Sequence, residues 1–142
     1  MRLLGLSTAV CLILLAAACA PAAGRPSIPY LAAPQEIISA LAAYGPTITP
    51  PSGYNFFSIE TIGDTFITLR ADVTTGIAVI GILGGTSTPP MRLTITTLEQ
   101  PQLTQVALSG LPVGRQTNDM LDEIVRFLDQ RFSRAPVPGG QG

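Results

Sequence analysis

The chain of 142 residues contains no histidine, no lysine and no tryptophan, and it has only two cysteines. Without histidine, the protein lacks the commonest general base and the commonest metal ligand. Without lysine, Schiff-base chemistry is excluded. These absences predict a protein that is not an enzyme and that holds no metal or other cofactor.

Charge is also scarce. Only 12% of the residues are charged, and the formal net charge is −1. All eight basic residues are arginines, and they are dispersed along the chain. Nucleic-acid binding requires clustered basic side chains that neutralise phosphates. The sequence therefore predicts no nucleic-acid partner.

The N-terminal residues have the three parts of an export signal. Arg2 provides the positive end, Leu3 to Leu15 form an apolar core, and three alanines at 16–18 form the exit. Such segments direct a chain out of the cytoplasm and are removed afterwards. We therefore expect residues 1–18 to be a signal peptide and not part of the fold.

The segment Leu15-Ala16-Ala17-Ala18-Cys19 resembles the lipobox of bacterial lipoproteins. That family favours Leu, Val or Ile at the position of Ala16. The resemblance implies that Cys19 becomes the first residue of the mature chain and carries lipid, including palmitate. It also implies an extracytoplasmic domain held at the cell membrane or outer membrane, and Ala20 after the cysteine points to the outer membrane.

Two other readings of the leader stay open. Cleavage after Ala18 or Ala22 would export the protein without lipid. An uncleaved membrane helix would need about 20 apolar residues, and the apolar run here is shorter. Cys11 lies inside the run and would be removed with it, so a lipidated chain has no thiol left for a disulfide.

The remaining chain divides into three parts. Residues 19–33 are the lipidated cysteine and a tether rich in proline and alanine, although Tyr30 and Leu31 could instead pack on the edge of the domain. Residues 34–134 form the domain, and 135–142 form a disordered tail.

Two helices are expected. Pro34 suits the first turn of a helix that runs to Tyr44, where Gly45 takes a left-handed cap and Pro46 prevents continuation. A second helix is capped by Thr117 or Asn118 and runs to about Arg134. Its buried stripe is Leu121, Ile124, Val125, Leu128 and Phe132.

Alternating β-branched and polar residues predict five strands between the helices. The third is apolar on both faces, so we expect it to be central. The predicted fold class is α+β, with a five-stranded antiparallel meander and an N-terminal and a C-terminal amphipathic helix packed on one face. The expected strands are Tyr54–Ile62, Thr65–Val73, Ile77–Leu83, Met91–Leu98 and Leu103–Ser109.

Few side chains in the domain suggest chemistry. Arg70 and Arg92 point outward from strands that flank the predicted central strand, so they would lie about 10 Å apart, where an anionic headgroup could bridge them. The simpler interpretation is that both arginines lie on a solvated face of the sheet and bind no ligand. Glu60, Asp72 and Glu99 are expected to be solvated strand residues, with carboxylate-only catalysis as the open alternative. Asp119, Asp122 and Glu123 are expected to be helix-start acids, with binding of a hard cation as the alternative. The glycines at 81, 84 and 85 are expected to end a strand and not to bind phosphate.

The sequence thus predicts a membrane-anchored, non-catalytic accessory that binds a partner or assists envelope assembly. The alternative is a carrier that holds a hydrophobic ligand or lipid between the C-terminal helix and the sheet. Five phenylalanines could line such a cavity or belong to an ordinary core (Phe56, Phe57, Phe66, Phe127 and Phe132).

Overall fold

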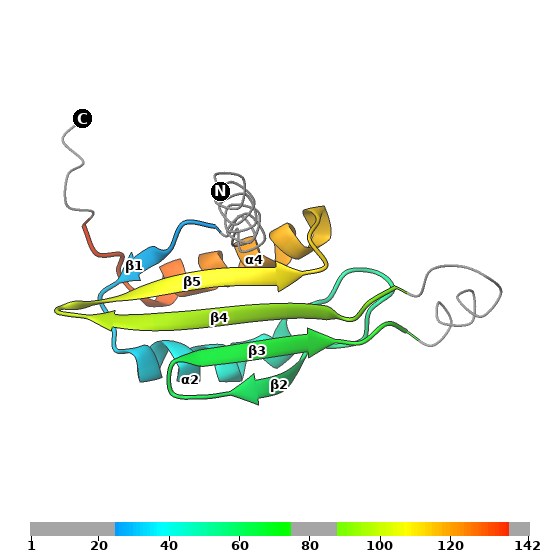
Figure 1. Cartoon of the computed structure of the whole chain (residues 1–142), viewed down its shortest axis with the longest axis horizontal. Coiled ribbons are helices and arrows are strands. Elements are labelled where there is room, and N and C mark those ends of the chain that lie inside the picture. The colour runs from blue at the N-terminus through cyan, green and yellow to red at the C-terminus, as the bar shows by residue number, and fades with distance from the viewer. Residues whose placement is uncertain (1–24, 75–87, 137–142) are drawn as a thin grey trace, which may run out of the picture.

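The computed structural model describes residues 25–74 and 88–136. Their strands form one antiparallel sheet of five, in the order β1-β5-β4-β3-β2, and two helices pack against one face of it (Figure 1). The predicted α+β fold class is confirmed. The elements are β1 (Ile28–Tyr30), α2 (Pro34–Tyr44), a 3-10 turn (Gly45–Thr47), β2 (Ser58–Ile62), β3 (Phe66–Ala71), β4 (Met91–Gln100), β5 (Leu103–Leu111) and α4 (Arg115–Arg131).

The sheet is not assembled from the strands that the sequence suggested. β3 pairs directly with β4, residue by residue from Phe66 opposite Thr96 to Ala71 opposite Met91. No strand lies between them, so the predicted central position of residues 77–83 is wrong; that segment itself lies outside the described residues. The first predicted strand is also shorter than expected, since regular pairing begins at Ser58.

The fifth strand, β1, lies within residues 19–33, for which the sequence allows either a tether or packing on the edge of the domain. Ile28 lies opposite Val106 of β5, and Tyr30 lies opposite Thr104. The other side of β1 is bonded to the end of the chain: Ala135 N–H donates to the Pro29 carbonyl at 2.9 Å, and Leu31 N–H donates to the Ser133 carbonyl at 2.8 Å. The first and last described segments thus close one edge of the sheet together.

Tyr30 anchors this closed edge. Its side chain is fully buried, and its hydroxyl donates to Asp129 on α4 at 2.9 Å. Asp129 in turn accepts from Arg134 at 2.6 and 2.7 Å. Burial, followed by the bond to Asp129, raises the pKa of Tyr30 far above its ordinary value. The phenol therefore stays protonated and remains a donor at any physiological pH.

α2 has the predicted limits. Pro34 occupies the first turn, and the Glu36 side chain accepts the otherwise unpaired N–H of Ala33 at 3.1 Å. The predicted left-handed cap at Gly45 is wrong, because this residue is helical with φ −48° and ψ −50°. Gly45 is required for close packing instead, since a Cβ there would lie 2.6 Å from Cδ2 of Leu69.

α4 begins and ends earlier than predicted, at Arg115 and Arg131. Thr117 is not its cap: the hydroxyl lies inside the first turn and donates back to the carbonyl of Pro112. The helix ends because Phe132 is extended, with φ −127° and ψ 141°. This extended turn directs the chain toward β1.

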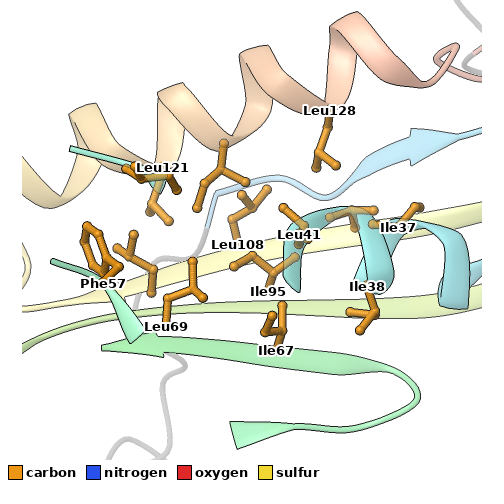
Figure 2. Packing of buried hydrophobic residues seen from close by; sticks show 14 of the residues in the cluster. Ile37, Ile38, Leu41, Phe57, Ile67, Leu69, Ile95, Leu108, Leu121 and Leu128 are labelled. Atoms are coloured by element: carbon orange, nitrogen blue, oxygen red, sulfur yellow. The ribbon is translucent and has the colours of Figure 1, made fainter. Parts of the chain in front are cut away.

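The core lies between the helices and the sheet (Figure 2). Along β4, buried and partly exposed residues alternate from Met91 to Thr97, which places every second side chain against the helices. Ile95 and Leu128, from β4 and α4, are both fully buried. Dense packing of this kind fixes the positions of the surface features described next.

Candidate functional site

The two predicted site arginines are closer together than expected. Arg70 on β3 and Arg92 on β4 are direct partners in the strand register, on the face of the sheet that the helices do not cover. The expected separation of two strand spacings is wrong, because it rested on an intervening strand.

Glu60 already lies between these two guanidinium groups. It accepts from Arg70 Nη1 at 3.1 Å, from Arg92 Nε at 2.9 Å and from Arg92 Nη2 at 3.0 Å. The β2–β3 register shifts between Ile59 and Thr61, and this β-bulge at Glu60 aims its carboxylate at the pair. The alternation of residues along the strand predicts a solvated carboxylate at Glu60, because this local pattern does not reveal a bulge.

The network is electrically balanced. Arg70 also donates to Asp72 at 2.8 Å, so two carboxylates serve two guanidinium groups. Bonds from Arg92 and then Arg70 hold the pKa of Glu60 below its ordinary value, so Glu60 is ionised at neutral pH. An external anion bridging the arginines stays a prediction, and such an anion would have to displace Glu60.

A groove runs between the two helices. It has a volume of about 640 Å³, and apolar side chains from both helices line it, including Ala40, Ala43 and Phe127. Glu36 and Arg131 contribute one charge of each sign. The groove is therefore a mainly apolar channel with a mixed-charge border.

An aromatic pair joins the helices in this groove. The rings of Tyr44 on α2 and Phe127 on α4 stack with centroids 3.9 Å apart and planes 3° apart. The Tyr44 hydroxyl donates to Glu123 at 3.1 Å. Burial, and then this bond, raises the pKa of Tyr44. The pair fixes the spacing of α2 and α4, so the groove is preformed.

A smaller hollow of about 330 Å³ lies where β5 meets the start of α4. Leu108 and Leu121 form its buried wall, while Leu111 and Val113 lie exposed at its rim. Arg25 also lines it, and its guanidinium pairs with Asp122 and donates to the Asn118 carbonyl at 3.0 Å. Arg25, the first described residue, is thus held beside this hollow.

The five phenylalanines considered for a ligand cavity do not converge. Phe57 is buried in the core, Phe66 lies on the uncovered sheet face, and Phe56 is 79% exposed. Only Phe127 and Phe132 share a site, the groove between the helices. A phenylalanine-lined cavity under α4 is therefore absent from the described residues.

The prediction of helix-start acids is wrong, because α4 begins at Arg115 and its first turn has no acidic residue. Asp122 pairs with Arg25, and Glu123 accepts a hydrogen bond from Tyr44. Within residues 25–74 and 88–136, no group of three or more metal-ligating side chains comes together. None of the helices in this part of the chain has the length and apolar character to cross a membrane. Cys19 and the glycines at 81–85 lie outside the described residues.

Comparison of the chain with protein-family models, with curated proteins and with solved structures finds no match.

Proposed function

We propose that the protein is a membrane-anchored bacterial lipoprotein whose small α+β domain is a non-catalytic accessory that binds a partner in the cell envelope. The observation that carries this proposal is the position of Cys19. It directly follows an export-type leader, and it lies only six positions (25 − 19 = 6) before Arg25, the first described residue, which already contacts the domain. An acyl group at Cys19 would leave the fold intact and hold it at a bilayer.

The anchor is tested by mass spectrometry of the protein extracted from membranes. We expect an N-terminal Cys19 with an acyl mass, together with palmitate labelling that is lost in Cys19→Ser. Cys11→Ser is the matched control, because this cysteine lies inside the leader and should be removed with it. An unmodified Cys19, or release of the parent protein into the aqueous wash, would refute the anchor.

The groove between α2 and α4 supports a binding role. A stacked aromatic pair and small alanines give it an apolar floor, and Glu36 and Arg131 place both charge signs at its border. An apolar peptide segment with flanking charges of both signs complements such a surface, so we assign the groove to a segment of another envelope protein.

Photo-crosslinking tests this assignment. A photoreactive residue replaces Ala43, which is exposed in the groove, or Thr96, which is exposed on the opposite face of the sheet. We expect a discrete adduct from position 43, with the partner peptide identified by mass spectrometry as part of an envelope protein, and none from position 96. Equal labelling from both positions would contradict the groove assignment.

The hollow at the start of α4 favours a second candidate, a carrier of a hydrophobic ligand. The buried wall of Leu108 and Leu121 could accept an acyl or similar apolar group. In a displacement assay with a fluorescent hydrophobic dye, a carrier releases the dye when a lipid extract is added. Dye that stays bound would exclude this candidate and leave the accessory role in place.

A further inference from the structure

The lipid anchor and the fold together define which surface meets the bilayer. β1 runs antiparallel to β5, with Ile28 opposite Val106, so the chain before Ile28 extends toward the C-terminal end of β5. Arg25 follows this direction, since it lines the hollow formed by Gly110 and Leu111. The chain from Cys19 therefore reaches the domain at the end where β5 gives way to α4.

The connection is too short to let the domain turn freely. Arg25 lies six positions after Cys19 (25 − 19 = 6), and six steps of fully extended chain span about 20 Å. The ten-residue strand β4 alone is about 33 Å long. One end of the domain must therefore stay close to the membrane surface.

The near end exposes apolar side chains. Val113 is 82% exposed and Leu111 is 58% exposed, with Pro112 between them. Arg25 pairs with Asp122 and Arg92 with Glu60, while the exposed Arg115 follows Val113 by two residues. This end therefore offers apolar side chains to the bilayer interface, with an arginine beside them that can contact headgroups.

We propose that Leu111, Pro112 and Val113 insert into the bilayer interface next to the acylated Cys19 and orient the domain on the membrane. This inference rests on the proposed lipid anchor. The hairpin between β4 and β5 would then point away from the bilayer, because Leu98 lies opposite Gln105, six residues or about 20 Å along β5 from Leu111.

The chain contains no tryptophan, so a single introduced tryptophan reports on its own position. Val113→Trp is the test variant. Leu98→Trp is the matched control, because Leu98 is 62% exposed at the other end of the same sheet. Both variants are purified as acylated protein and reconstituted in phosphatidylethanolamine–phosphatidylglycerol vesicles, with or without lipids brominated on their acyl chains.

We expect brominated lipids to quench the indole of the Val113→Trp variant at least twofold more than that of the Leu98→Trp variant, and the emission of the former to shift to the blue. Aqueous acrylamide should show the reverse preference. The proposed orientation would be overturned, while the anchor stands, if brominated lipids quenched both variants equally or quenched Leu98→Trp more strongly. It would also be overturned if acrylamide quenched both indoles and brominated lipids quenched neither. Mass spectra of the same samples that lack the acyl group would overturn the anchor and the orientation together.

Discussion

Replacing Tyr30 tests whether the stretch before α2 belongs to the fold. If residues 19–33 were all tether, Tyr30→Ala would change the free energy of unfolding by no more than about 0.5 kcal/mol, as at other surface positions. In the structure Tyr30 is fully buried between β5, α4 and the C-terminal segment. Truncation of a buried aromatic ring typically costs about 4 kcal/mol.

The hydroxyl can be separated from the ring. Tyr30→Phe keeps the packing and loses only the bond to Asp129, which retains Arg134 as its partner. The expected cost is about 1 kcal/mol. For a domain of this size, 1 kcal/mol corresponds to a Tm change of about 4 °C, so we expect losses of about 4 °C for Phe and about 15 °C for Ala.

The assay is thermal unfolding, followed by circular dichroism, of the non-acylated protein without its leader. Leu31→Ala is the control, because this neighbouring side chain is 52% exposed and should change Tm by no more than about 2 °C. If Tyr30→Ala behaved like Leu31→Ala, β1 would not be part of the stable fold. The inferred short connection to Cys19 would then fail as well.

Three further predictions concern packing and charge. Gly110→Ala should cost about 2 kcal/mol, because a Cβ there would overlap the Thr117 methyl group and lie 3.2 Å from Leu93. Gly114→Ala has open space around it and should cost less in the same unfolding assay, about 0.5 kcal/mol, because alanine is a poorer N-cap than glycine. Hydrogen bonds from Arg134, and then from Tyr30, lower the pKa of Asp129, so the stabilising contribution of this carboxylate is present above pH 3.8 and is lost as the pH falls below that value. Asp129→Asn should therefore lower Tm at pH 7 and make Tm fall less steeply in acid than it does in the parent. Parallel Tm profiles of the two proteins in acid would contradict this. Glu60→Gln removes the carboxylate between the two sheet arginines, so added phosphate should raise Tm more in this variant than in the parent; equal shifts would argue against an anion site.

Local sequence signals predicted the elements that have clear ends. α2 was located correctly because Pro34 and Pro46 mark its limits. β4 and β5 were located to within a few residues because their apolar and polar side chains alternate. The sequence does not decide between tether and strand at β1, since this strand has three residues and contains Pro29, which lacks the N–H of a typical strand residue.

The errors that affect the site came from strand pairing, which the local pattern of residues does not reveal. The apolar composition of residues 77–83 suggested a central strand, but β3 and β4 pair with each other directly. That error separated Arg70 from Arg92, and the unpredicted bulge then concealed the role of Glu60. Likewise, Tyr44 and Phe127 are 83 residues apart (127 − 44 = 83), and only the packed helices bring their rings together.

The closed edge around β1 also sets an order of events during synthesis. A ribosome makes Ile28–Tyr30 about a hundred residues before Ser133–Ala135, yet these two segments are hydrogen-bonded to each other. The outer side of β1 thus has no partner until residues 133–135 have been made. A chain interrupted before Ser133 would expose that backbone to pairing with other chains, so quality control should recognise incomplete copies of this protein readily.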